Sequence, residues 1–208
     1  MFVRPEWKMD DQAAIRDLID RHPLAVLVSS EAQGPVATSC PLLLDPARGP
    51  NGTLVGHMAR ANPHWRSFEA APQVLAMFTG PEGYVSPAWY PKRDMAPTWY
   101  YCAVHCHGRV RLIDDEPTLR ASLDTLVARM EHGRQLPWCA AELGEAGIAR
   151  RLKQIVGFEI VIERTVAKFK LGQDEPLPDA LAAAAQMPAD KACLRELVEH
   201  HNAQRPSH

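Results

Sequence analysis

The 208-residue sequence has no run of apolar residues near the roughly 20 that span a bilayer as a helix. Its net charge of −2 provides no general attraction for nucleic-acid phosphates, which counts against direct DNA binding unless a local basic patch supplies it. The five cysteines are scattered and include no C-x-x-C motif, which argues against a disulfide framework or a structural zinc site. The charged N-terminus is unlike a signal peptide, so we expect a cytoplasmic protein that does not enter a membrane.

The composition is that of a soluble globular protein, with 46% apolar and 23% charged residues. The length allows one large domain, alone or with a smaller helical appendage, and a sizeable core. No internal repeat and no low-complexity segment is visible.

Periodic apolar patterns predict many strands with helices between or beside them. The segment 100–113 is the clearest strand, because apolar residues alternate with His105, His107, Arg109 and Arg111. Further strands are expected over 24–30, 35–44, 53–58, 74–78 and 156–171, and helices over 10–22, 63–70, from 115 onward, over 142–153 and on both sides of Pro188. No βα repeat occurs, so an α+β barrel is favoured over a doubly wound sheet.

The apolar phase changes within the last predicted strand. Up to Ile162 the even-numbered residues are apolar, whereas from Ala167 the odd-numbered residues are. We expect a bulge or a turn near Arg164 and Thr165, because a one-residue slip would otherwise exchange the two faces.

The segment 56–65 reads as the end of a strand, a short turn and the start of a helix. Asn62 suits the N-cap and Pro63 the first helical position. Unpaired N–H groups at this helix start, together with Arg60, suit a phosphate group. The alternative is an ordinary capped helix with a solvated arginine.

Other side chains near this turn have ordinary interpretations as well. His57 and His64 could lie near the phosphate, but a buried, hydrogen-bonded histidine is the commoner arrangement. Trp65 and Phe68 are three residues apart on one helical face, which is more typical of core packing than of flavin stacking.

The face of strand 100–113 that carries His105, His107, Arg109 and Arg111 forms a basic stripe. Two histidines do not make a coordination set, so we expect no metal there. The stripe fits a solvated or dimer-facing surface, which could also help to hold an anionic ligand. The loop 91–97, flanked by aromatic pairs, fits a lid, a subunit contact or a plain surface loop equally well.

Several motifs, taken in order, resemble one known family. They are PVATSCPL (35–42), GHMARANPHW (56–65), VLAMFTGP (74–81), WY (89–90), PTW (97–99), VH (104–105) and IVGF (155–158). The chain resembles the PaiB family from about residue 1 to 173. These proteins are described as FMN-binding negative transcriptional regulators. The resemblance implies the FMN-binding split β-barrel fold, with flanking helices and a helical C-terminal segment, in a homodimer with FMN at the subunit interface.

The resemblance also implies where FMN binds. The phosphate would lie at the turn after strand 53–58, and the adjacent strand would meet the ring edge. The expected cofactor-binding residues are Thr38, Ser39, Cys40, Pro41, His57, Met58, Ala59, Arg60, Asn62 and Trp65. We expect residues 1–173 to form the FMN-binding domain and residues 174–208 a helical tail beside it.

Two other functions fit the same fold. One is a flavin-dependent oxidoreductase, for which the sequence offers no recognisable catalytic side-chain set. The other is a haem-binding protein using a histidine such as His57 or His105. Pro87, Tyr100 and the segment 170–174 depart from the family pattern and concern the rim of the pocket.

Overall fold

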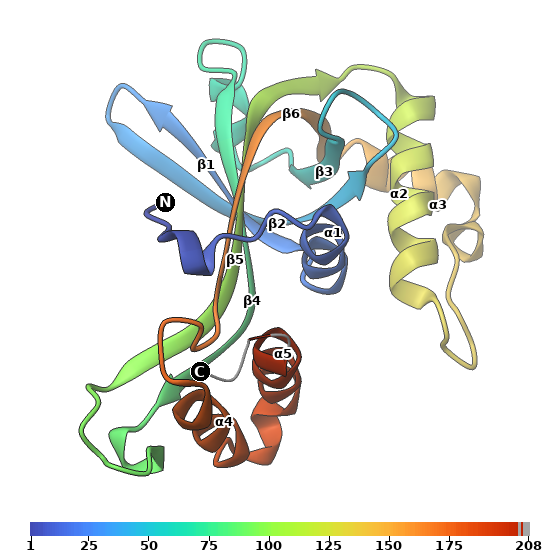
Figure 1. Cartoon of the computed structure of the whole chain (residues 1–208). Helices are drawn as coiled ribbons and strands as arrows, with labels where there is room; N and C mark the ends of the chain where they lie inside the picture. Colours follow the sequence, from blue (N-terminus) through green and yellow to red (C-terminus); the bar gives the residue numbers. More distant parts are fainter. Residues whose placement is uncertain (204, 206–208) are drawn as a thin grey trace. The chain divides into compact units, whose positions relative to one another are not determined.

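The computed structural model describes residues 1–203 and residue 205. The strands are β1 (Leu24–Glu31), β2 (Gly34–Asp45), β3 (Thr53–Ala59), β4 (Gln73–Val85), β5 (Thr98–Ile113) and β6 (Ile155–Lys170). They close into a barrel in the order β1-β2-β3-β6-β5-β4 (Figure 1). The α+β barrel expected from the sequence is therefore confirmed.

Five α-helices accompany the strands. They are α1 (Gln12–Arg21), α2 (Glu116–Glu131), α3 (Gly144–Leu152), α4 (Leu177–Ala185) and α5 (Ala192–Ala203). Short 3-10 helices are η1 (Pro5–Trp7), η2 (Pro63–Ser67), η3 (Pro87–Trp89), η4 (Ala140–Leu143) and η5 (Ala189–Lys191). Among the described residues, no helix combines the length and the apolar character that a membrane span requires.

The chain divides into two compact units. Unit 1 comprises Met1–His22, Phe78–His105 and Val166–His208, and unit 2 comprises Pro23–Met77 and Cys106–Thr165. Strands β4, β5 and β6 each contribute one part to either unit. The expected division at residue 173 stays a prediction.

Antiparallel pairing joins β1, β2, β3 and the first part of β6 within unit 2. Strand β1 pairs antiparallel with β2 from Leu24 opposite Pro41 to Glu31 opposite Gly34. Strand β3 pairs with both β2 and β6, with Gly56 opposite Leu42 on one side and Phe158 on the other. Leu42, Leu54, Phe158 and Ile160 of these strands are fully buried and form part of the barrel core of this unit, as a half-buried strand pattern requires.

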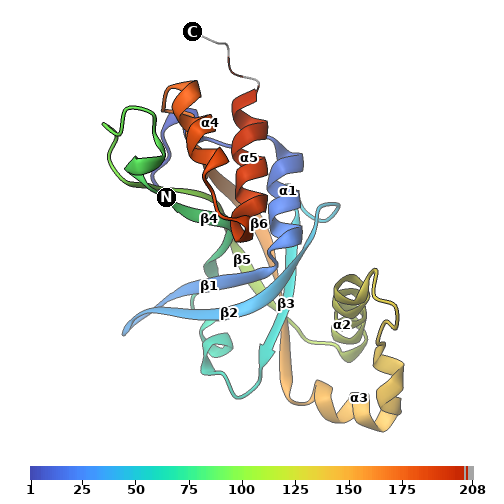
Figure 2. The same cartoon turned by 90° about the horizontal axis from the view of Figure 1, so that it is seen from below.

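Helices α2 and α3 lie beside each other in unit 2 (Figure 2), and residues of α2 line a hollow together with Leu43, Leu44 and Asp45 of β2. Leu119 of α2 packs with Ile148 and Leu152 of α3 in a small separate cluster. Leu119 also reaches β6, because a Cβ atom on Gly157 would lie only 2.6 Å from its Cδ1 atom. A glycine at this position therefore lets the helical hairpin approach the strand.

Unit 1 gathers the two ends of the chain around α1, α4 and α5. Asp11 caps α1 by accepting the backbone N–H of Ala13. Figure 2 shows α1 beside α5, and side chains of both helices line a hollow of about 330 Å³. The loop 91–97 lies in this unit and includes Arg93 with a left-handed φ of 56°; its role stays a prediction.

Three details differ from the sequence-based expectations. The strand expected over 74–78 continues to Val85. The helix expected over 63–70 is a five-residue 3-10 helix, since the chain turns again before Pro72. The burial phase changes between Ile162 and Ala167 within a continuous β6, which excludes the turn; the bulge, the other expected alternative, stays a prediction.

Gly108 gives a direct test of the packing between β5 and β6. A Cβ atom there would overlap the carbonyl oxygen of Val161 and approach Cγ2 of Ile160 to 2.9 Å. We expect Gly108→Ala to lower the free energy of unfolding by about 3 kcal/mol, because a backbone oxygen cannot move aside without separating the strands. Urea denaturation measures this effect. Gly147→Ala on α3 is the control: its Cβ atom would lie 3.1 Å from Cβ of Leu143, a milder contact that the helix propensity of alanine partly offsets, so its effect should be much smaller. Equal urea midpoints for the two variants would contradict the close approach of β5 to β6 at Gly108.

Candidate functional site

The turn between β3 and η2 has the cap that the sequence predicts. The side-chain oxygen of Asn62 accepts the backbone N–H of His64 at 3.0 Å, and Pro63 occupies the first position of η2. The N-cap prediction is confirmed. A 3-10 helix of five residues has a much weaker dipole than the expected α-helix, so any phosphate here depends mainly on side chains.

A buried histidine joins this turn to two strands. The imidazole of His64 is 1% exposed, with Nε2 2.8 Å from Oγ of Ser29 on β1 and Nδ1 2.8 Å from Oγ1 of Thr38 on β2. The side-chain amide of Asn62 donates to the same Thr38 oxygen at 3.1 Å. The sequence analysis named a buried, hydrogen-bonded histidine as the commoner arrangement but did not predict its partners, because the bonded residues lie 24 to 35 positions apart.

The His64 ring is held neutral. Burial lowers its pKa, so at pH 7 one ring nitrogen donates a hydrogen bond and the other accepts one. Ser67 donates its hydroxyl proton to the carbonyl oxygen of His64, and the ring packs edge-on against Phe68 at 5.2 Å between centroids. The network therefore fixes the shape of the turn rather than supplying a charge to it.

Arg60 ties the same turn to the start of β6. Its Nε donates to the carbonyl oxygen of Lys153 at 3.0 Å and its Nη2 to that of Ile155 at 2.8 Å. Its backbone N–H bonds to Gln154, and its own carbonyl accepts the indole N–H of Trp65. The guanidinium is thus held in place by the carbonyl groups that follow α3, and its Nη1 has no hydrogen-bond partner among the described residues.

The period of β2 separates the residues expected at the ring edge. Thr38 and Cys40 point to one side, and Ser39 and Pro41 point to the other. Cys40 is 3% exposed, and burial raises the pKa of its thiol to about 11. A buried, protonated thiol is a packing group, so the reachable polar side chain of this segment is Ser39.

Strand β3 separates its residues in the same way. Met58 is buried in the core, whereas His57 is half-buried on the opposite side and Ala59 is exposed. Burial lowers the pKa of His57, and within the described chain its imidazole has no hydrogen-bond partner. An unsatisfied imidazole of this kind is available to a ligand.

All ten predicted cofactor residues lie in unit 2, but they do not form one surface. Ser39, His57 and Arg60 offer a hydroxyl, an imidazole and a guanidinium outside the core, while Cys40 and Met58 contribute packing. The accessible donor set fits a phosphorylated ring compound, since FMN presents a phosphate anion and polar ring-edge atoms.

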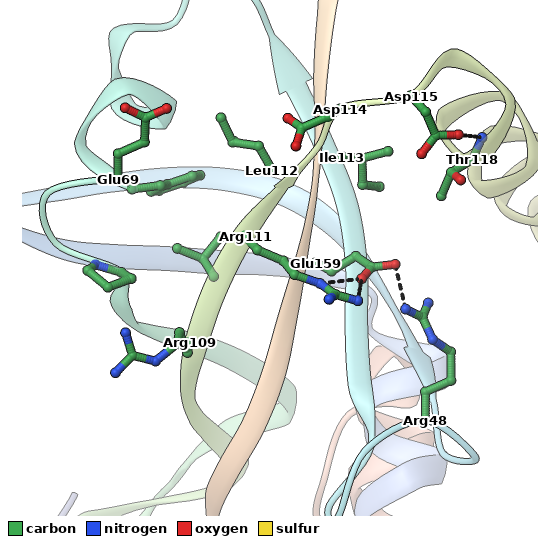
Figure 3. A pocket seen from close by; sticks show the side chains of 13 residues that line it. Arg48, Glu69, Arg109, Arg111, Leu112, Ile113, Asp114, Asp115, Thr118 and Glu159 are labelled. Atoms are coloured by element: carbon green, nitrogen blue, oxygen red, sulfur yellow. Dashed lines mark hydrogen bonds and ion pairs between the residues drawn. The ribbon is translucent and has the colours of Figure 1, made fainter.

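A second polar cluster surrounds Glu159 of β6 (Figure 3). Its carboxylate is 4% exposed and accepts from Nη2 of Arg111 at 2.6 Å, Nε of Arg111 at 2.9 Å and Nη2 of Arg48 at 2.7 Å. Burial alone would raise the pKa of Glu159, but the two guanidinium groups outweigh it and hold the pKa below its usual value. The hollow beside them has a volume of about 760 Å³. The basic stripe of β5 indicated Arg109 and Arg111, whereas the 48-residue separation concealed the Glu159 partner.

The two histidines of the stripe show no metal site. Among residues 1–203 and 205, no three histidine, cysteine or acidic side chains are arranged to hold a metal ion. Nε2 of His107 is buried without a hydrogen-bond partner, and burial and Arg164 lower the pKa of this ring.

Comparison with known proteins identifies the family. The profile of a family described as "Putative FMN-binding domain" matches residues 1–164. The Bacillus subtilis (strain 168) protein named "Protease synthase and sporulation protein PAI 2" is 32% identical over 187 residues, covering 90% of this chain and 89% of that protein. The chain belongs to the PaiB family. This match confirms the predicted cofactor, FMN, at the level of the family.

Solved structures agree with the PaiB assignment in their fold. The FAD and heme binding protein from Mycobacterium smegmatis has a TM-score of 0.60 at 21% identity, over 79% of this chain and 74% of that one. The flavocytochrome Anf3 from Azotobacter vinelandii has a TM-score of 0.59 at 17% identity, over 80% and 70% of the two chains. At these identities the likeness concerns architecture, and it supports the split β-barrel class for this PaiB protein.

Proposed function

We propose that this PaiB protein binds FMN as a homodimer and acts as a negative regulator of gene expression. Family membership over residues 1–164 carries the cofactor part of the proposal. The regulatory part is supported by the name of the Bacillus subtilis relative, which links that protein to protease synthesis and sporulation.

We place the FMN phosphate at the turn between β3 and η2. Arg60 is fixed there by two backbone carbonyl groups, and the His64 network holds the turn in one shape. A prearranged guanidinium loses little freedom when it binds an anion, which favours affinity. Ser39 and His57 then face the ring edge from β2 and β3.

The reactive group of such a site is the flavin itself, which supplies electron transfer when bound. The accessible residues of this chain bind the flavin and orient it. Among the described residues, the Ser29–His64 pair is 2.8 Å apart but buried, so it is closed to a substrate.

The net charge of −2 makes a purely electrostatic attachment to DNA unfavourable. The regulatory role can therefore operate through a local basic surface or through another protein. Retardation of promoter fragments at moderate salt, with and without FMN, distinguishes these routes. Light scattering of the FMN-loaded protein tests the homodimer.

Replacing Arg60 with alanine tests the flavin site. We expect the free energy of FMN binding to weaken by about 1.5–3 kcal/mol, because a charge-assisted hydrogen bond to phosphate is lost. Titration of flavin fluorescence measures the affinity. The control is Arg66→Ala, which removes an exposed arginine from η2 whose guanidinium lies 5.5 Å from the Trp65 ring.

The first observation needed is the absorbance spectrum of the purified protein reconstituted with FMN. Saturable flavin binding supports the proposal. A Soret band without flavin binding would replace it by haem binding, and equal FMN affinity in wild type and Arg60→Ala would remove Arg60 from the site.

A further inference from the structure

We propose that the hollow lined by Arg48, Arg109 and Arg111 binds a phosphate monoester at a site separate from the flavin. The lining residues all belong to unit 2, and none of the ten predicted flavin residues is among them. In Figure 3, Arg111 lies between Arg109 and Arg48, and Arg48 comes from the loop between β2 and β3.

The charges near the arginines suit a dianion. Three guanidinium groups (+3) and the buried Glu159 carboxylate (−1) sum to +2 at the arginine end of the hollow, whereas Glu69, Asp114 and Asp115 bring the whole lining to −1. A phosphate monoester has about two negative charges at pH 7, so it would balance this end. A phosphate also matches the planar, forked arrangement of guanidinium donors.

The arginines keep donors for a ligand after binding Glu159. Arg111 uses Nε and Nη2, and Arg48 uses Nη2, so each has at least one terminal nitrogen left. Arg109 is exposed and has no ion pair within the described chain. Glu159 positions two of the guanidinium groups, and exposed Arg109 is the third member that a ligand would recruit.

The rest of the hollow indicates what the phosphate is attached to. Phe68, Val110 and Leu112 provide an apolar wall, and the volume of about 760 Å³ is that of a small-molecule site. The lining also includes three more carboxylates, of which Asp114 and Asp115 follow the end of β5 and Glu69 lies apart from them in Figure 3. Asp115 already accepts the N–H of Thr118 at 2.8 Å. A compact ligand with an apolar or aromatic body and an amino or hydroxyl group near Asp114 fits this lining.

Phenyl phosphate is a suitable probe, because it combines a phosphate monoester with an aromatic ring. Isothermal titration calorimetry of the full-length protein, loaded with FMN and also free of it, measures its affinity. We expect saturable binding in both forms. Arg109→Ala should weaken binding roughly tenfold or more, whereas Arg16→Ala, which removes an exposed arginine from α1 in unit 1, should not change it.

Glu159→Gln provides a second variant with the opposite sign. It keeps the side-chain shape and removes one negative charge, so phenyl phosphate should bind about threefold to tenfold more tightly. Circular dichroism of both variants confirms that they are folded. Failure of Glu159→Gln to tighten binding in a folded protein contradicts the charge argument.

Two further outcomes separate this proposal from the proposed function. If FMN displaces phenyl phosphate and Arg109→Ala also weakens FMN, the hollow is the flavin phosphate pocket and a separate site is ruled out. If phenyl phosphate binds through Arg109 but FMN does not bind at all, this inference stands and the flavin function fails. Absence of saturable phenyl phosphate binding to wild type overturns the inference directly.

Discussion

Replacing His64 with alanine is expected to lower the free energy of unfolding by about 3–4 kcal/mol. The ring is 1% exposed, so its loss leaves a cavity beside Phe68. The loss also removes the common partner of Ser29 and Thr38, whose hydroxyl groups lie 2.8 Å from the two ring nitrogens. Urea denaturation at pH 7.5 measures the change, and His132→Ala in the exposed loop after α2 is the control.

The role of His64 in stability can also be measured through the pH dependence of the free energy of unfolding. Burial lowers the pKa of His64 in the folded protein, so below about pH 6.5 the unfolded chain binds the extra proton more readily. The stabilisation of the folded protein by the neutral His64 ring is therefore present at neutral pH and is lost as the pH falls. This part of the acid sensitivity should disappear in His64→Ala.

FMN binding should also weaken in this variant, because the ring that links Ser29 of β1 and Thr38 of β2 to the turn is lost. A folded His64→Ala protein with unchanged stability and unchanged FMN affinity would show that the turn keeps its shape without the ring.

The second large effect is expected at Glu175 in unit 1. Its side chain is buried, and Oε2 accepts the hydroxyl of Tyr90 at 3.0 Å and also that of Tyr100. Glu175→Ala leaves both buried phenol groups without this acceptor and should lower the free energy of unfolding by about 2–4 kcal/mol.

Glu175→Gln is expected to raise the free energy of unfolding at neutral pH, in contrast to Glu175→Ala. Burial raises the pKa of Glu175 more than the two tyrosine hydrogen bonds lower it. The folded state therefore holds the proton more tightly than the unfolded state, and stability is lost as the pH rises from about 4.5 through the folded-state pKa. Glutamine stays neutral, so its advantage over wild type should grow across this range.

Urea denaturation of wild type and Glu175→Gln from pH 4.5 to 8 tests whether the stability advantage of the glutamine variant grows with pH. Comparing the two proteins cancels the histidines with lowered pKa values, which change stability in the opposite direction. Glu199→Gln, an exposed substitution on α5, is the control. If the difference in free energy of unfolding between Glu175→Gln and wild type shrinks as the pH rises, Glu175 is ionised more readily in the folded state than in the unfolded state.

The local parts of the site could be read from the sequence with good accuracy. The period of β5 indicated the stripe with Arg109 and Arg111, and Asn62 caps η2 as its position before Pro63 implied. Both signals depend on residues within a few positions of one another. The resemblance of ordered motifs likewise gave the family and its cofactor, although it could not separate inward from outward side chains at residues 38 to 41.

The amino-acid sequence by itself determined the strands, the capped turn and the PaiB family of this protein, because backbone periodicity, caps and motifs are encoded by neighbouring residues. Only the tertiary structure decided which polar groups meet. Glu159 reaches Arg48 across 111 residues, Tyr90 reaches Glu175 across 85, and Arg60 reaches Lys153 across 93. Such partners come together only when the chain folds back on itself, since the energy of each contact depends on burial that no local segment can provide.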